Sequence, residues 1–313
     1  MPTIVAYTKP PERVLAFLEQ HAEVKVRPAH QDEEAFLQAL PEADGLIGAG
    51  YPVNEKLLEM APRLKVVSNV STGYDNLDMK ALTARGITAT NTPYVLIDTV
   101  ADTIMGMMLA AARRIPQADR GVKEGRWKDK RDESFFGVNV HHKTIGIIGM
   151  GKIGEEVARR ASAGFHMDVL YHNRSEKQNV EAVYAGLDEL LETSDFVLLM
   201  TPLTAETKHF IRREHFRKMK KTAVFLNAAR GAVVKETDLI EALETKEILA
   251  AGIDVYEQEP VDPDNPLLAL DSAVTLPHIG SATAETREAM YQDAAEQCAA
   301  ALAGKVPEHK IEG

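Results

Sequence analysis

A glycine pattern near the middle of the chain constrains the fold more than any other feature. Gly149, Gly151 and Gly154 have the spacing G-x-G-x-x-G, and they stand between an apolar, β-branched run at 144–148 and a segment with helical periodicity at 153–163. The first glycine permits a tight turn, the second lets the backbone approach a pyrophosphate, and the third lets the helix pack on the strand. The pattern therefore predicts a strand–turn–helix unit whose helix N-terminus binds the phosphates of a dinucleotide.

The composition is that of a globular chain with room for two domains. Of its 313 residues, 45% are hydrophobic and 27% are charged, which is ordinary for a folded protein of this length. Cys298 is the single cysteine, so a disulfide framework is not expected. The chain begins Met-Pro-Thr-Ile-Val, without a charged and then apolar leader, and this predicts a cytoplasmic protein.

Charge and hydropathy argue against two classes of partner. The formal net charge of -11 disfavours nucleic acid, and a local basic cluster at 123–131 is interpreted as a solvated loop. The richest apolar run, 104–112, is too short to span a bilayer. We therefore expect neither nucleic acid nor a membrane as a partner.

The first part of the chain alternates short apolar runs with helical patterns, and this βαβα order predicts a parallel sheet with helices on both faces. Strands are expected at residues 4–7, 24–26, 46–48 and 64–70, and helices at 12–20, 33–40 and 54–60. A loop rich in small and polar residues, 69–75, follows the fourth strand. It is either a ligand-binding loop at the carboxyl end of the sheet or a plain connection.

A long helical segment, 98–115, comes next and is interrupted by Pro116. The helix is apolar almost all round, because one face holds Val100, Ile104, Met107, Met108 and Ala111, and much of the rest holds Ala101, Met105 and Leu109. Such a helix suits burial between domains or between subunits.

A second series of strands and helices follows, so two doubly wound parallel-sheet α/β domains are predicted. Its strands are expected at 144–148, 168–172, 196–200, 222–227, 249–255 and 274–276. The final segment, 283–302, has the periodicity of one long helix with no strand after it, and we expect it to return and cover the first domain. The expected domains are 1–98 with 287–313, and 99–286.

Three reactive side chains follow consecutive strands of the second series, so they are expected to meet in one crevice. Arg230 can fork onto a carboxylate and a neighbouring keto oxygen. His278 can give the proton that a developing alkoxide needs, and Glu259 can hydrogen-bond the imidazole and favour its charged form. Each residue alone also suits an ordinary structural role; their shared position favours hydride transfer to a 2-keto acid.

The residues after the second strand of this series predict the cofactor. An NAD site has an acidic side chain there, which accepts hydrogen bonds from the adenosine ribose hydroxyls. This chain instead has Asn173, Arg174 and Ser175. No carboxylate therefore repels a 2′-phosphate, and the arginine guanidinium can donate two hydrogen bonds to it. A polar turn indifferent to the cofactor is the alternative. We predict NADPH as the preferred cofactor, with NADH as a second donor.

These motifs together resemble the D-isomer-specific 2-hydroxyacid dehydrogenases over nearly the whole chain. The resemblance rests on Gly149-Met150-Gly151-Lys152-Ile153-Gly154, Pro202-Leu203-Thr204, Asn227-Ala228-Ala229-Arg230-Gly231, Gly252-Ile253-Asp254-Val255, Glu259-Pro260 and Pro277-His278-Ile279-Gly280-Ser281. It implies a Rossmann nucleotide-binding domain inserted in a flavodoxin-like substrate domain, and a homodimer formed through the long apolar helix. Within the family, Thr72-Gly73-Tyr74-Asp75-Asn76 and His141-His142-Lys143-Thr144 are most similar to bacterial glyoxylate/hydroxypyruvate reductases, also called 2-ketogluconate reductases.

The resemblance also implies further site residues. Backbone N–H groups of Val70, Ser71 and Gly73 would contact the substrate carboxylate. Thr103 would reach the nicotinamide end of the cofactor, and Asp254 would hold its carboxamide. The remaining cofactor contacts implied are Gly149, Gly151, Lys152, Ile153, Gly154, Thr201, Pro202, Thr207, Ala228, Ala229, Arg230, His278 and Gly280. No metal site is expected.

The function predicted is hydride transfer from NADPH to a small 2-keto acid, namely glyoxylate, hydroxypyruvate or 2-ketogluconate, to give the D-2-hydroxy acid. Two alternatives remain open. One is a dehydrogenase of the same fold for another substrate; formate is disfavoured by Glu259, and 3-phosphoglycerate by the end of the chain at Gly313 without a regulatory domain. The other is a nicotinamide-sensing corepressor with little turnover.

Overall fold

The computed structural model describes residues 1–312, and these form two compact units. Unit 1 comprises Met1–Leu96 and the segment that begins at Ala282, and unit 2 comprises Ile97–Ser281. The expected boundaries, 98/99 and 286/287, lie two residues after the first junction and five residues after the second. Both units are parallel α/β structures, which is the predicted fold class.

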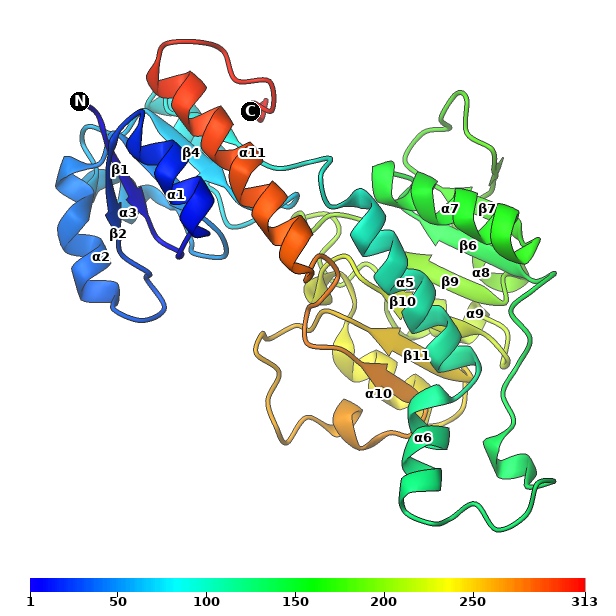
Figure 1. Cartoon of the computed structure of the whole chain (residues 1–313). Helices are drawn as coiled ribbons and strands as arrows, with labels where there is room; N and C mark the ends of the chain where they lie inside the picture. Colours follow the sequence, from blue (N-terminus) through cyan, green and yellow to red (C-terminus); the bar gives the residue numbers. More distant parts are fainter. Residues whose placement is uncertain (313) are drawn as a thin grey trace. The chain divides into compact units, whose positions relative to one another are not determined.

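Unit 1 is built on a five-stranded parallel sheet in the order β2-β1-β3-β4-β5. Figure 1 labels β1, β2 and β4 of this sheet. Its strands are β1 (Thr3–Ala6), β2 (Glu23–Val26), β3 (Gly45–Gly48), β4 (Val66–Asn69) and β5 (Thr88–Thr90). The first four agree with the predicted runs to within two residues at each end. The fifth was not predicted because Thr88–Thr90 is short and carries two threonines, so it has no apolar run.

Helices cover this sheet, and the last of them comes from the far end of the chain. They are α1 (Glu12–Glu19), α2 (Glu33–Ala39), η1 (Leu40–Glu42), α3 (Glu55–Met60), α4 (Met79–Ala84) and α11 (Ala284–Leu302). Helix α11 packs against β3, β4, β5 and α1, which confirms that the terminal helix returns to the first domain. Met290, Ala294 and Cys298 are buried on its inner face.

Unit 2 is built on a seven-stranded parallel sheet in the order β12-β11-β10-β9-β6-β7-β8. Its strands are β6 (Thr144–Ile148), β7 (Asp168–His172), β8 (Val183–Tyr184), β9 (Phe196–Leu199), β10 (Val224–Asn227), β11 (Ala250–Ile253) and β12 (Ala273–Thr275). The strand predicted at 249–255 ends earlier, so Asp254 lies in the loop after β11 and not within the strand. The two-residue edge strand β8 was not predicted, because it is exposed and too short to show a pattern.

The helices of unit 2 are α5 (Ile97–Ala112), α6 (Ile115–Lys123), η2 (Glu133–Phe135), α7 (Lys152–Phe165), α8 (Leu187–Thr193), α9 (Arg213–Lys218), η3 (Gly231–Val233), α10 (Glu236–Glu244) and η4 (Pro266–Ala269). Helix α5 ends three residues before the predicted limit. Pro116 lies in the first turn of α6, where its missing N–H costs nothing, so it starts a helix instead of ending one.

Helix α5 is covered by its own unit. It packs against α7, β10, β11 and β12, and Ile104, Met105 and Met108 are buried. Asp98, Asp102 and Gly106 form the exposed stripe. The packing of α5 within unit 2 therefore accounts for its apolar character, and the predicted subunit interface is not needed to explain it.

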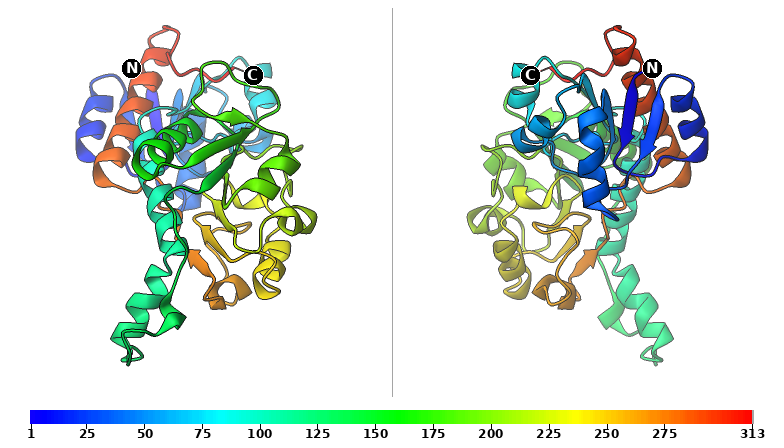
Figure 2. Two further views of the ribbon diagram at one scale, coloured as in Figure 1. Left: turned by 90° about the vertical axis from the view of Figure 1, so that its right-hand side faces the viewer. Right: turned by 90° about the vertical axis from the view of Figure 1, so that its left-hand side faces the viewer.

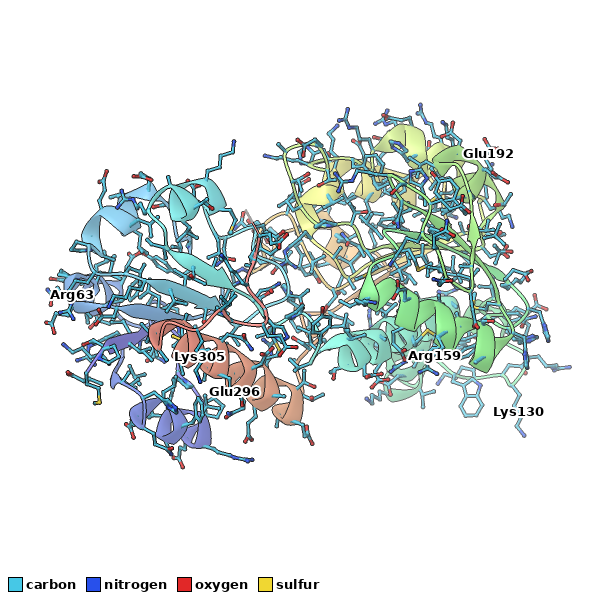
Figure 3. The ribbon with its side chains drawn as sticks, turned by 90° about the horizontal axis from the view of Figure 1, so that it is seen from above. Arg63, Lys130, Arg159, Glu192, Glu296 and Lys305 are labelled. Atoms are coloured by element: carbon cyan, nitrogen blue, oxygen red, sulfur yellow. The ribbon has the colours of Figure 1, made fainter. Side chains whose placement is uncertain are left out.

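The basic cluster at 123–131 is exposed throughout, as predicted (Figure 3 labels Lys130). Its charges are locally paired, because Lys123, Arg126 and Arg131 contact carboxylates two to four residues away. Within residues 1–312, every helix is too short or too polar to cross a membrane. The same residues hold no group of three His, Cys, Asp or Glu side chains arranged to bind a metal ion.

Candidate active site

The glycine turn after β6 has the geometry that its spacing predicts. Gly149 has φ of 101°, and a Cβ there would lie 2.7 Å from the carbonyl of Met200, so only glycine fits. A Cβ at Gly154 would lie 2.9 Å from the Gly149 oxygen, which shows how closely α7 packs on the turn. A Cβ at Gly151 would meet no atom within 4 Å, so this position is open to a ligand.

The N-terminus of α7 faces this open position. Helix α7 begins at Lys152, so the backbone N–H groups of Lys152 and Ile153 belong to its first turn and have no partner further back in the helix. Aligned peptide dipoles make this end positive. The turn therefore fits the pyrophosphate of a dinucleotide.

Asn173, directly after β7, is fixed against the same turn. Its Oδ1 accepts a hydrogen bond from the Met150 N–H at 2.7 Å, which leaves its amide NH₂ to donate elsewhere. Arg174 and Ser175 are exposed beside it. The pKa of Glu206 is lowered mainly by the Thr204 hydroxyl, and the charge of Arg174 is a minor cause, so Arg174 lies within electrostatic reach of the loop after β9.

The loop after β9 holds Thr201, Pro202 and Thr207 close together. The Thr207 hydroxyl donates to the Pro202 carbonyl at 2.7 Å and accepts from the Thr204 N–H at 2.7 Å. The Thr201 hydroxyl donates to the Ile148 carbonyl at the end of β6. These bonds close the loop beside the glycine turn.

Asp254 fixes the turn that carries His278. Its Oδ1 accepts from the Ile279 N–H at 2.7 Å, and its Oδ2 accepts from the Gly280 N–H at 2.8 Å. Burial raises the pKa of Asp254, although these two bonds favour the ionised form. Since both oxygens already accept backbone bonds, its first role in the structure is to orient this turn. Thr103 donates to the Gly280 carbonyl at 3.2 Å, so the predicted Thr103, Asp254 and Gly280 lie together.

Arg230 stands in a turn shaped by buried neighbours. Asn227, 2% exposed, accepts from the Ala229 N–H and donates to the Arg230 carbonyl, so it clamps the segment through Ala228. A Cβ at Gly231 would lie 1.9 Å from the Tyr256 carbonyl group, so glycine is required where the turn after β10 meets the loop after β11. This close approach brings Arg230 toward Glu259.

Glu259 and His278 form a direct pair, as predicted. Nδ1 of His278 lies 2.6 Å from Oε2 of Glu259, while Oε1 accepts from the Tyr256 N–H at 3.0 Å. An ionised carboxylate only accepts, so Nδ1 donates and Nε2 is left to face a substrate. The side chains remain 48% and 34% exposed for His278 and Glu259, so the pair is reachable by a small molecule.

The charges around Glu259 keep it ionised. Burial alone would raise its pKa, but the hydrogen bond from His278, the Tyr256 N–H and the charge of Arg230 hold it below its ordinary value. The influence of Arg230 on this pKa shows that all three predicted catalytic side chains lie within electrostatic reach of one another.

The loop after β4 in unit 1 holds the predicted substrate contacts in a network of its own. The Val70 N–H donates to the Gly48 carbonyl at 2.7 Å, and the Ser71 N–H donates to the Asn69 carbonyl at 2.8 Å. Asn69 also donates from its side chain to the Gly73 carbonyl. Two of the three N–H groups expected to contact a carboxylate thus already donate to carbonyls within unit 1.

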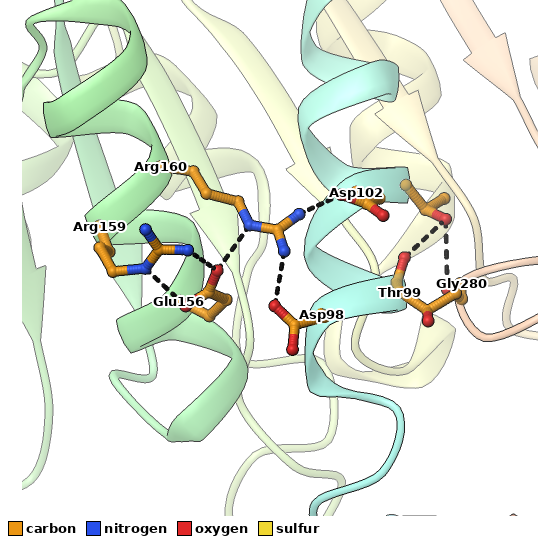
Figure 4. Close-up of polar contacts among 8 residues, drawn as sticks. Asp98, Thr99, Asp102, Glu156, Arg159, Arg160 and Gly280 are labelled. Carbon is orange, nitrogen blue, oxygen red and sulfur yellow. Dashed lines mark hydrogen bonds and ion pairs between the residues drawn. The ribbon is translucent and has the colours of Figure 1, made fainter. Parts of the chain in front are cut away.

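Arg160 joins the helix of the glycine turn to α5 (Figure 4). It pairs with Asp98 at 2.7 Å, with Asp102, and with Glu156 at 2.7 Å. Thr103 on α5 also donates a hydrogen bond to the Gly280 carbonyl. Helix α5 therefore connects the helix of the glycine turn to the loop that carries His278.

Sequence reasoning missed several residues that position the site. Asn227 was named only as part of a motif, and Tyr256, at the end of an apolar stretch, was not named; only their contacts reveal their role. Lys177 was missed because it lies five residues beyond the end of β7, where no motif extends. Its ammonium contacts the Met150 carbonyl in the glycine turn at 3.1 Å.

Comparison with known proteins decides the family. Residues 105–280 match the family described as D-isomer specific 2-hydroxyacid dehydrogenase, NAD binding domain. The chain belongs to this family. Among curated relatives, glyoxylate/hydroxypyruvate reductase B of Salmonella newport (strain SL254) is 48% identical over 316 residues, covering 99% of this chain and 98% of the relative. The protein of that name from Salmonella typhimurium (strain LT2) gives the same values.

Solved structures agree in fold over the whole chain. The TT0316 protein of Thermus thermophilus has a TM-score of 0.93 at 38% identity, covering 99% of this chain and all of that one. The NADPH-dependent glyoxylate/hydroxypyruvate reductase of Sinorhizobium meliloti, solved with NADP and malonate, has a TM-score of 0.90 at 31% identity, covering 99% of this chain and 96% of that one. The chain is therefore an NAD(P)-dependent oxidoreductase whose dinucleotide-binding domain is unit 2.

Proposed function

We propose that this protein reduces glyoxylate and hydroxypyruvate to the corresponding D-2-hydroxy acids with NADPH. The single observation that carries the proposal is the arrangement of Arg230, Glu259 and His278, which supplies an anion clamp, a carboxylate and a proton donor in one place. The names of the Salmonella and Sinorhizobium relatives support the choice of substrate.

The residues of the chain divide the work of the reaction. Arg230 binds the substrate carboxylate and polarises the keto oxygen. When bound, the reduced nicotinamide supplies the hydride to the keto carbon. Nε2 of His278 gives its proton to the oxygen that becomes the hydroxyl, and Glu259 stabilises the imidazolium before the transfer. The hydride and this proton together balance the reduction of the ketone to an alcohol.

The cofactor contacts proposed in unit 2 divide into four groups. The glycine turn and the first turn of α7 hold the pyrophosphate. Asn173, Arg174 and Ser175 hold the adenosine ribose and its 2′-phosphate. Thr201, Pro202 and Thr207 contact the cofactor from the loop after β9. The nicotinamide end is assigned to Thr103, Ala228, Ala229, Asp254 and Gly280, with Arg230 and His278 alongside.

In unit 1, we propose Val70, Ser71 and Gly73 as substrate contacts, with one condition set by the structure. Because the Val70 and Ser71 N–H groups already donate to carbonyls, each would have to share or release its bond when a carboxylate binds.

A panel of 2-keto acids assayed for kcat/KM with NADPH tests the substrate assignment. Glyoxylate and hydroxypyruvate should give steady oxidation of NADPH at rates above those with pyruvate, 2-ketogluconate or 3-phosphohydroxypyruvate. Binding of NADPH without turnover of any acid would contradict the proposal and favour a cofactor-sensing protein.

We also propose a homodimer, formed through the segment 115–138 in place of α5. This segment, called the arm, extends from the rest of unit 2 in Figure 2. The end of the arm returns to the end of α5, since the Val138 N–H donates to the Ala112 carbonyl at 2.8 Å. Ile115, Val122, Trp127 and Phe136 on the arm are each more than half exposed. A second copy of this chain would remove that apolar surface from water.

Sedimentation at micromolar concentration tests the dimer. The unmodified protein should sediment as a dimer, and the double variant Val122→Gln/Trp127→Gln should sediment as a monomer. Lys128→Gln is the matched control, because it changes a neighbouring arm residue without removing apolar surface. A monomeric unmodified protein would contradict this assembly.

A further inference from the structure

We propose that Lys177 is a specificity-determining residue that binds the 2′-phosphate of NADPH, and that Glu155 competes for its ammonium when the phosphate is absent. The proposal rests on the NADPH use proposed above. It concerns two residues to which no cofactor role is given by the glycine pattern or by the residues that directly follow β7.

The position of the Lys177 ammonium is set by the glycine turn. Its Nζ contacts the Met150 carbonyl at 3.1 Å, while Asn173 accepts from the N–H of the same Met150 at 2.7 Å. The lysine and the asparagine are therefore anchored on the two polar groups of a single residue. Since we propose that Asn173 binds the adenosine ribose, the Lys177 ammonium would lie beside that ribose.

The backbone of Lys177 is also fixed. The Lys177 N–H donates to the hydroxyl of Tyr171 at 2.9 Å, and that hydroxyl donates to the Lys177 carbonyl at 3.3 Å. Tyr171 is 1% exposed within β7, so the loop returns to the sheet at this residue. A buried tyrosine that holds the lysine in place reduces the entropy lost when the ammonium binds a ligand.

Lys152 and Lys177 both pair with the carboxylate of Glu155, in the first turn of α7. Glu155 forms an ion pair with Lys177 through Oε1 and a second with Lys152 at 3.3 Å through Oε2. Burial alone would raise the pKa of Glu155, but the hydrogen bonds from the two lysines hold it below its ordinary value. When Lys177 turns to a phosphate, Lys152 still neutralises Glu155. The cluster therefore has one positive charge to spare, and Arg174 adds another.

Lys177 remains 33% exposed on its side chain, so it is accessible to a ligand but partly shielded from water. A charge-assisted bond to phosphate in such a place should contribute about tenfold in affinity, less than a fully buried pair would. Glu155 should lower the affinity for the phosphate by a smaller factor, since it competes for the same ammonium.

Calorimetric titration of the full chain with NADP⁺ and with NAD⁺, without substrate, tests the proposal. In Lys177→Met the dissociation constant for NADP⁺ should rise about tenfold while that for NAD⁺ stays unchanged. Lys177→Arg should retain most of the NADP⁺ affinity. Lys56→Met, which removes an exposed lysine from α3 in unit 1, is the control for net charge and should change neither constant.

Two results would overturn the proposal. One is an unchanged ratio of the two constants in Lys177→Met, and the other is an equal loss for both cofactors, which would mean that Lys177 only supports the turn. Glu155→Gln should tighten NADP⁺ binding about threefold more than NAD⁺ binding, and an equal change for the two cofactors would overturn the competition by Glu155. The unmodified protein tests the proposed NADPH preference separately, because its own ratio of constants does not depend on which residue binds the phosphate.

Discussion

Along its strand order, the sheet of unit 2 has two sides, one at β6 and β7 and the other at β10, β11 and β12. These two sides achieve specificity in different ways. On the side of β6 and β7, the ligand site is made mostly of backbone, with glycines at Gly149 and Gly151 and exposed polar side chains around them. On the side of β10, β11 and β12, charged side chains are held by buried partners such as Asn227 and Asp254. We infer that the first side selects the cofactor and the second side performs the proton chemistry.

This difference predicts unequal effects of mutation. A site made of exposed polar contacts should lose moderate binding energy when one of them is removed. A site that places a proton donor should lose rate by a larger factor, because proton transfer depends on one group.

The largest effect is expected for the proton donor and the anion clamp. His278→Ala should lower kcat by about 10²- to 10⁴-fold with little change in KM, because it removes a positioned acid. Arg230→Ala should lower kcat/KM by a similar factor and also raise KM, since it removes the contact of the guanidinium with the substrate carboxylate. Steady-state kinetics with glyoxylate measure kcat and KM for both variants. Arg230→Lys, which keeps the charge but not the fork, should recover only part of the loss. A His278→Ala variant with unchanged kcat would remove this residue from the mechanism.

The next effect is expected on the cofactor side. Asn173→Asp keeps the acceptor for the Met150 N–H but adds a charge that repels a 2′-phosphate and accepts from ribose hydroxyls. It should shift the ratio of kcat/KM for NADPH over NADH by roughly ten- to a hundredfold, toward NADH. Arg174→Ala should reduce the preference for NADPH without reversing it. Measuring the ratio for each variant distinguishes the two, and an unmoved ratio in Asn173→Asp would show that this side does not select the cofactor.

These two sides also differ in how far the sequence alone could predict them. The glycine turn is encoded by local spacing, and its geometry at Gly149 and Gly154 followed from that spacing. Arg230, Glu259 and His278 could be brought together in advance because each follows a strand of one parallel sheet, and the His278–Glu259 bond confirms that pairing.

What the sequence could not predict depends on contacts across long separations. The buried clamp at Asn227 and the fit of Gly231 against Tyr256 arise only when β10 and β11 lie side by side. Apolar residues almost all round α5 suggested a subunit interface, but the sheet and helices of its own unit cover them. The strands β5 and β8 are too short or too polar to leave a pattern.

A smaller effect is expected on the pH dependence. Glu259 is ionised throughout the neutral range because its pKa is lowered, so its charge supports the imidazolium of His278 there. Reductive activity should fall as pH rises and the imidazolium is lost, and in Glu259→Gln that fall should begin at lower pH. A pH profile of kcat/KM measures the shift. An identical profile in the variant would mean that Glu259 is not the partner of His278.

The smallest effect is expected at the ion-pair network that joins α5 and α7. Hydrogen bonds from Arg159 and Arg160 lower the pKa of Glu156 to about 2, so its contribution to stability is present above the ordinary pKa of 4.5 and is lost as pH falls toward 2. Glu156→Gln should reduce the unfolding free energy at neutral pH by about 1 kcal/mol or less, because Arg159 is solvent-exposed and Arg160 keeps its bonds to Asp98 and Asp102. Denaturant titrations at neutral pH and near pH 2 should show the difference vanish in acid. A difference that persists there would contradict an electrostatic role.

The division of work between the two sides of this sheet is tested most directly by two variants in one assay. The pH profile of kcat/KM for glyoxylate is measured with NADPH and with NADH for the unmodified protein, Asn173→Asp and Glu259→Gln. Our account predicts that Asn173→Asp changes the ratio between cofactors and leaves the midpoint of the profile in place, while Glu259→Gln moves the midpoint and leaves the ratio in place. If either variant changed both quantities to a comparable extent, the two sides would not act independently and the account would be contradicted.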